Sequence, residues 1–255
     1  MSFYDLSKAE RVTLVASIKK EIASDLTKKS INNILHYFSD EDTYIRKAAY
    51  LSIGRIYFEQ IELQKKIISL LEDLLKKENF KIRQTVINAA GEIGIKEFEP
   101  VERFFDTGLF DKHHSPRNAV IGSIKKMSEK NPKPILKWAK KYLHHTNKEI
   151  RREICHGIEL RGRTHPQDIL PLLKELQFDT TARVKNTLVH VLGQIAYKKG
   201  CLETVIADLN KWQNKELVLK AIDEIIDVHY RYRNFSVFTQ KEAITYINKN
   251  FKNSK

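Results

Sequence analysis

Residues 81–94 read KIRQTVINAAGEIG, and this short stretch decides the fold. Its apolar and small side chains recur three and four positions apart, which is the spacing of one face of an amphipathic helix. Similar stretches occur at 44–57 (YIRKAAYLSIGRIY) and 183–196 (RVKNTLVHVLGQIA). In all three, a glycine follows nine residues after the first aligned apolar position, at Gly54, Gly91 and Gly193. The recurrence predicts one helix that is repeated along the chain.

The repeat has a nearly constant period. Successive aligned positions are separated by 37, 34, 34, 34 and 34 residues, at Ile45, Ile82, Pro116, Ile150, Val184 and Val218. Other amphipathic stretches lie between them, at 61–77, 133–143, 166–176 and 202–212. A fixed period of this length is typical of stacked helical repeats. We therefore expect an all-α, right-handed solenoid of five to six helix pairs, forming one domain over residues 1–255, with a first helix near 7–24, repeats over about 29–230 and a last helix near 239–250.

Charge and composition limit the classes of function that the protein can have. The formal net charge is +13, and residues 112–163 hold 14 Lys and Arg but only four Glu. Such a concentration favours binding to a polyanionic partner. The alternative is a basic face that contacts only solvent. No apolar run approaches the length needed to span a bilayer. Two cysteines, Cys155 and Cys201, make no disulfide framework, so a cytoplasmic protein is expected.

The repeat over about 29–230 resembles HEAT repeats. In that family an Asp or Asn before the second helix of a pair and an Arg just inside it often form a structural ladder. The resemblance implies this structural role for one basic residue per repeat, namely Arg46, Arg83, Arg117, Arg151 and Lys185. It leaves Arg152, Arg161 and Arg163 without an assigned role, as well as the lysines over 125–141.

Residues 130–196, from KNPKPILKWAKKYL to VLGQIA, are similar to the HEAT-like DNA glycosylases of the AlkC and AlkD type. That family shares a proline-led helix, an Asp or Asn turn and a second helix opening with an apolar residue and a basic one. The resemblance implies a C-shaped solenoid whose basic concave face holds double-stranded or branched DNA. It also implies excision of cationic alkylated purines, without a cofactor.

The catalytic motif of the AlkD branch, Trp-Trp-Asp-Thr-Val-Asp, has only a loose counterpart here, FFDTGLFD at 104–111. Matching the letters places Phe105 at the lesion-contacting Trp and either Leu109 or, with an insertion, Asp111 at the carboxylate, whereas the 34-residue register places Arg117 there. Asp106 is the other candidate acid, and His190 falls near a second family Trp. Breaking a glycosidic bond builds positive charge on the sugar, so an unplaced carboxylate leaves excision doubtful.

The expected DNA contacts combine this resemblance with local charge. Arg152 matches a phosphate-binding Arg of the family, and Arg161 and Arg163 flank Gly162 in what we expect to be a flexible turn. The segment HYRYRNF at 229–235 interleaves cations and aromatics, which can grip a backbone and stack on bases. The alternative is a loop that its aromatics anchor to the last repeat. The predicted set is Arg117, Lys148, Arg152, Arg161, Arg163, Arg231 and Arg233.

The sequence also leads to expectations about metal sites, oligomeric state and an alternative function. The adjacent histidine pairs, 113–114 and 144–145, lack the i, i+3 or i+4 spacing of helical metal ligands, so we expect no metal site. A monomer is expected, because no feature indicates self-association. The alternative function is a HEAT-repeat scaffold that binds a protein in its groove and has no nucleic-acid role.

Overall fold

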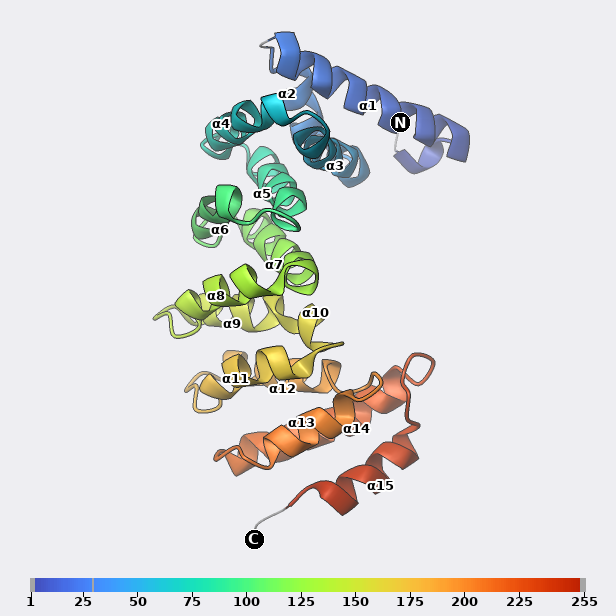
Figure 1. Cartoon of the computed structure of the whole chain (residues 1–255), viewed down its shortest axis with the longest axis vertical. Coiled ribbons are helices and arrows are strands. Elements are labelled where there is room, and N and C mark those ends of the chain that lie inside the picture. Colours follow the sequence, from blue (N-terminus) through green and yellow to red (C-terminus); the bar gives the residue numbers. More distant parts are fainter. Residues whose placement is uncertain (1–2, 29, 253–255) are drawn as a thin grey trace. The chain divides into compact units, whose positions relative to one another are not determined.

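The computed structural model describes residues 3–28 and 30–252, and within them the regular elements are all helices (Figure 1). This confirms the expected all-α solenoid of HEAT-like helix pairs. The chain divides into two compact units, residues 1–131 and 132–255. Each unit is described by itself.

The first unit begins with a long helix, α1 (Lys8–Lys28), which starts close to the predicted position and continues four residues beyond it. Three helix pairs follow: α2 (Asn32–Ser39) with α3 (Thr43–Glu59), α4 (Gln64–Leu75) with α5 (Phe80–Gly94), and α6 (Glu102–Gly108) with α7 (His114–Lys130). The second helices of the pairs pack in series, α3 on α5 and α5 on α7. Their contact surfaces form the continuous core of this unit.

The second unit repeats the plan. Its elements are α8 (Pro132–Tyr142), α9 (Lys148–Gly157), the short α10 (Glu159–Gly162), α11 (Pro166–Glu175), α12 (Ala182–Gln194), α13 (Cys201–Leu209), α14 (Lys215–Arg231) and α15 (Gln240–Asn250). Again the second helices pack in series, α9 on α12 and α12 on α14. These second helices, α9, α12 and α14, are called the inner row below, and they carry Lys148, Arg152, His190 and Arg231 among the candidate residues.

Short polar side chains start the second helices. The side chains of Asp42, Asn79, Asn147 and Asn214 each accept a hydrogen bond from a backbone N–H in the first turn of α3, α5, α9 and α14. These N–H groups have no partner inside the helix, so the cap satisfies them. Asp179, which precedes α12, accepts hydrogen bonds from Arg151 and from the backbone of Thr181.

The recurring glycines allow the inner helices to approach closely. A Cβ added at Gly91 would lie 2.4 Å from Oγ of Ser123 on α7, and one added at Gly193 would lie 2.5 Å from Cγ of Glu224 on α14. At contacts this short the neighbouring side chains would have to shift, so glycine favours close packing where the helices cross. The glycine signature of the sequence therefore records helix packing and not a turn.

Candidate functional site

Arg83 and Asp111 form a ladder contact in the first unit. The Nε and Nη2 atoms of Arg83 donate to the two Asp111 carboxylate oxygens at 2.6 and 2.9 Å, and Nη1 donates to the carbonyls of Lys77 and Glu78. Burial of the Asp111 carboxyl opposes ionisation, but the hydrogen bonds from Arg83 and the backbone of His113 outweigh it and lower the pKa. Asp111, a candidate catalytic acid, is thus engaged in holding the fold.

The same arrangement recurs in the second unit. Arg151 donates to the Asp179 carboxylate from Nε at 2.6 Å and from Nη2 at 3.2 Å, and to the carbonyls of His145 and Thr146. Arg and Asp are 28 residues apart in both ladders, and both carboxylates are nearly buried. These contacts agree with the structural role that the resemblance to HEAT repeats implies for Arg151.

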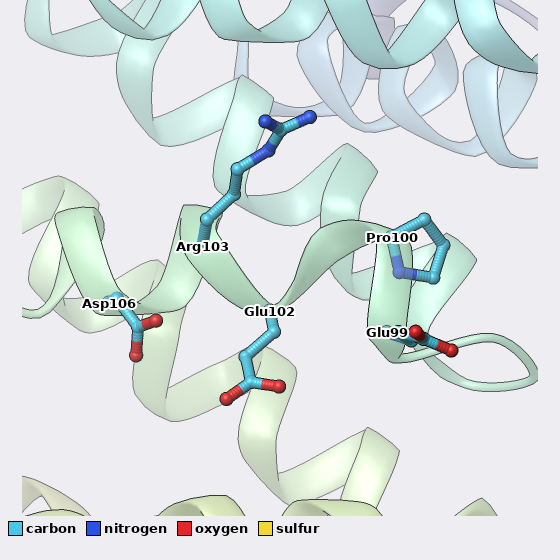
Figure 2. Close-up of a pocket in the computed structure, with 5 residues that line it drawn as sticks. All are labelled: Glu99, Pro100, Glu102, Arg103 and Asp106. Carbon is cyan, nitrogen blue, oxygen red and sulfur yellow. The ribbon is translucent and has the colours of Figure 1, made fainter.

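Asp106, the other candidate acid, lies on α6 beside an open cavity of about 600 Å³ in the first unit (Figure 2). The cavity is lined by Glu99, Pro100, Glu102, Arg103 and Asp106. Arg103 forms an ion pair with Glu72, and its guanidinium points away from the carboxylates of Glu102 and Asp106 (Figure 2). A hollow with three carboxylates and no aromatic lining suits neither a DNA backbone nor a flipped purine.

Phe105 is completely buried, and its ring stacks on Phe98 with 5.8 Å between centroids. The expected contact with a damaged base is therefore corrected to a packing role, because a ring without exposed surface has no face to offer. Phe110 is the exposed aromatic of this segment, with half of its surface accessible. Phe105 and Asp111 consequently do not form the aromatic–carboxylate pair that excision would need.

The predicted phosphate-binding arginines of the second unit have acidic partners within the chain. Arg152 is 3.0 Å from Glu149 and 3.4 Å from Glu153. Arg161 binds Asp168 through Nε at 2.8 Å. These side chains are only 16–20 % exposed. Their charges are largely compensated inside the protein, which reduces what they could contribute to binding a phosphate.

Arg163 and Gly162 also have surroundings that differ from those expected. The Nη2 atom of Arg163 is 2.5 Å from Glu159 Oε1 and 3.0 Å from Gln194 Oε1. A Cβ added at Gly162 would lie 2.3 Å from Cδ1 of Ile169, and its φ is not positive. Gly162 is therefore a tight packing contact rather than the flexible turn that the sequence suggested.

The other residues predicted to contact DNA differ in whether their side chains already have partners within the chain. Arg117 donates to the backbone carbonyl of Asp111, and Arg231 to Glu224 and Asp227. Arg233 lies over the ring of Tyr230, 5.1 Å from its centroid, at the exposed end of α14. Lys148 is exposed at the start of α9 and has no ion-pair partner among residues 3–28 and 30–252.

Exposed lysines line one face of α8. Lys133, Lys137, Lys140 and Lys141 are spaced four, three and one residues apart, and all four are exposed, while Ile135, Trp138 and Ala139 on the opposite face are buried. Lys140 pairs with Glu175 at 3.1 Å. Lys133 and Lys137 form no ion pair within the described part of the chain. The available positive charge of this unit therefore lies on α8 more than on the arginines.

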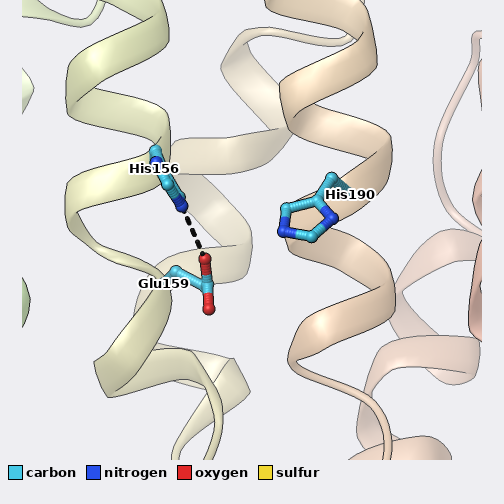
Figure 3. A group of neighbouring side chains, drawn as sticks. All are labelled: His156, Glu159 and His190. Atoms are coloured by element: carbon cyan, nitrogen blue, oxygen red, sulfur yellow. Dashed lines mark ion pairs between the residues drawn. The ribbon is translucent and has the colours of Figure 1, made fainter. Parts of the chain in front are cut away.

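The inner row also brings together a cluster that the sequence reading did not identify. His156 on α9, Glu159 on α10 and His190 on α12 place one possible ligand atom each within 4.8 Å of the others (Figure 3). His156 and His190 are 34 residues apart, which is one repeat period, and Glu159 follows His156 by three. Both signals were present in the sequence, but each histidine alone resembled an isolated surface residue.

Cys155 takes no part in this cluster. It is fully buried, and burial raises the pKa of its thiol far above the ordinary range. It is a small core residue and not a nucleophile.

Among the described residues, no helix is long and apolar enough to cross a membrane.

Comparison with solved structures places the fold among helical-repeat proteins. AlkD2 from Streptococcus mutans is similar at a TM-score of 0.52 and 15 % identity, covering 80 % of this chain and 97 % of its own. A chain from the structure of the Pds5–Scc1 complex is similar at a TM-score of 0.51 and 11 % identity, covering 96 % of this chain and 42 % of its own. At these identities the likeness concerns the fold alone. No curated protein matches the sequence.

A family model gives a more specific relationship. The Cnd1 model matches residues 13–159, which is more than half of the chain and includes the first unit's helix pairs together with α8 and α9. The matched segment includes the Arg83–Asp111 ladder and the lysines of α8. The chain belongs to the Cnd1 family, described as non-SMC mitotic condensation complex subunit 1.

Proposed function

We propose that this protein is a non-catalytic HEAT-repeat module that binds the phosphate backbone of duplex DNA, acting as one domain over residues 1–255. The observation that carries the proposal is the lysine face of α8, formed by Lys133, Lys137, Lys140 and Lys141. These cations project to solvent from one helix face. Lysine contacts to phosphates release counterions and carry no sequence information, so the binding would be independent of sequence.

Helix geometry supports this use of α8. Residues 133 to 141 span about 12 Å along the axis at a rise of roughly 1.5 Å per residue. Positions i, i+4, i+7 and i+8 share one helix face. Lys140 can leave Glu175, because an exposed ion pair contributes only about 0–1 kcal/mol. Lys148 at the start of α9 and Arg233 at the end of α14 are further candidate contacts within this unit.

We infer that the protein does not excise alkylated purines. Asp111 is bound by Arg83, Phe105 is buried, and the hollow beside Asp106 is acidic. An oxocarbenium-like transition state needs a carboxylate that faces the sugar. Release of methylated purines by the wild-type chain would contradict this inference, and its loss in D106N but not in D111N would identify the acid.

The DNA proposal is tested by measuring affinity for a duplex at several salt concentrations. Replacing Lys133 and Lys137 together by Gln should lower the salt slope by about 1.8, since each phosphate contact contributes about 0.9. A matched control replaces Lys241 and Lys249 of α15, which are equally exposed, and should leave the slope unchanged.

Two results would contradict the DNA proposal. One is a slope that falls equally in both double variants, which would indicate a response to net charge rather than contact through α8. The other is no duplex binding even at low salt. That second result would favour the protein-binding scaffold, a function for which HEAT-type solenoids provide extended surfaces.

A further inference from the structure

We propose that His156, Glu159 and His190 form a binding site for a zinc-like divalent transition-metal ion. Two imidazoles and one carboxylate are a donor set that zinc uses when three protein ligands leave a fourth position open. All three residues lie in the second unit, on α9, α10 and α12. This departs from the expectation of no metal site, and it is independent of DNA binding.

The distance between two of the donors suits such an ion. Nε2 of His156 lies 3.2 Å from Oε2 of Glu159. Two ligands of a tetrahedral zinc ion, at bond lengths of about 2.0–2.1 Å, are separated by about 3.3 Å. A metal ion can therefore be bound by both atoms without separating them.

Glu159 is held in position by its other oxygen. Its side chain is only 1 % exposed, and Oε1 accepts hydrogen bonds from Nε and Nη2 of Arg163. Nη2 of Arg163 also donates to Gln194. The arrangement directs Oε2 toward His156. Partners of this kind, which orient a ligand without touching the metal, are typical of metal sites.

His190 has a carboxylate behind its ring. Its Nδ1 is 3.5 Å from Oε1 of Glu224, and the other ring nitrogen faces the His156–Glu159 pair (Figure 3). Hydrogen bonding to Glu224 would fix the tautomer that offers Nε2 as a ligand. Its side chain is 44 % exposed, so it can rotate to close the remaining gap of up to 4.8 Å.

The repeat explains why these groups meet. His156, His190 and Glu224 stand 34 residues apart in turn, on α9, α12 and α14. Equivalent positions of stacked repeats lie side by side. The two histidine ligands and the supporting carboxylate of Glu224 are therefore neighbours. Both histidines also line a cavity of about 340 Å³ together with Arg152, Arg183, Asn186 and Thr187, which gives an ion and a fourth ligand a route of access.

The donor atoms select the class of ion. Arg152 and Arg183 line the same cavity, although both pair with Glu149. Hard cations such as Mg²⁺ and Ca²⁺ rely on several oxygen ligands, and here one carboxylate is available. Imidazole nitrogens suit zinc and its neighbours in the first transition row. The site should therefore bind Zn²⁺ and Co²⁺ but not Mg²⁺.

The experiment titrates the full chain, freed of metal with a chelator, with Zn²⁺, Co²⁺ and Mg²⁺ by calorimetry, and follows the Co²⁺ complex by visible absorption. One equivalent of Zn²⁺ and a low-coordinate Co²⁺ spectrum are expected, with no heat from Mg²⁺. Both signals should disappear in H156N and in H190N. E224Q should weaken Zn²⁺ affinity by about 10- to 100-fold, the usual effect of removing a supporting partner.

The control is H165N, which removes an exposed histidine of the same unit and should keep the full equivalent. H190N is the main variant, because the His190 side chain is partly exposed. Circular dichroism verifies that each variant is folded. The proposal is overturned if the wild-type chain binds less than one equivalent. It is equally overturned if the equivalent survives in folded H190N, or is lost in H165N.

Discussion

Arg83 and Asp111 bind each other across successive helix pairs, with two hydrogen bonds of 2.6 and 2.9 Å and only 8 % of either side chain exposed. Arg151 and Asp179 repeat this relationship in the other unit, again 28 residues apart. A bidentate pair of this kind fixes the start of one helix to the turn before the next. Arg83 thereby engages both oxygens of the Asp111 carboxylate.

Separating the first of these pairs should destabilise the protein strongly. D111N or R83A leaves a nearly buried charge without its partner, which costs about 3–5 kcal/mol. Urea denaturation followed by circular dichroism measures the loss. D106N, on helix α6 where the side chain is only partly buried, should cost clearly less. Equal effects of D111N and D106N would contradict the ladder assignment.

Arg151 and Lys148 should separate stability from binding on a single helix. R151A removes an arginine that holds Asp179 and two backbone carbonyls, so the melting temperature should fall clearly. K148A removes an exposed cation and should leave the melting temperature unchanged while lowering the salt slope of DNA binding by about 0.9. A reversed pattern in calorimetry and binding assays would mean that the two roles are exchanged.

Gly162 should not tolerate even a methyl group. In G162A the added Cβ would meet Cδ1 of Ile169 and Cγ2 of Ile195, and overpacking of this kind costs about 1–3 kcal/mol. Trimming Ile169 to Val in the same chain should recover part of the loss, since it removes Cδ1. G122A is the matched control, because nothing lies within 4 Å of the added Cβ on α7. That change should stabilise by about 0.5–1 kcal/mol.

His229 should make stability depend on pH. Its ring is fully buried in α14, with Nδ1 2.8 Å from the Ile225 carbonyl, and burial lowers its pKa. The unfolded chain therefore takes up this proton at a higher pH than the folded chain does. The contribution is complete above the unfolded value of about 6.5 and is lost as pH falls below it.

The measurement compares urea midpoints of wild type and H229L at pH 7.5 and pH 5.5. Wild type should lose more stability than H229L between the two, because the variant has no buried group to protonate. H165N, which removes an exposed histidine, should follow the wild type. A constant difference between wild type and H229L at both pH values would rule out this role for His229.

The sequence by itself determined the architecture. A 34-residue period, apolar side chains three and four apart and capping residues such as Asn79 and Asn147 are local features, and each predicts a helix or its start from neighbouring residues. The assignment of Arg151 to the ladder followed from the resemblance to HEAT repeats, which the period supports. Stacking conserves the environment of equivalent positions, so a repeat position is informative about its structural role.

Only the tertiary structure decided which charges are available and which histidines meet. A net charge counts Arg161 and Arg163 as free cations, but Asp168 and Glu159 compensate them, and this pairing depends on where the side chains lie around helices α10 and α11. The burial of Phe105 likewise depends on packing between helices. His156 and His190 become neighbours only when α9 stacks on α12, because contact across a repeat needs the stacking that no single segment encodes.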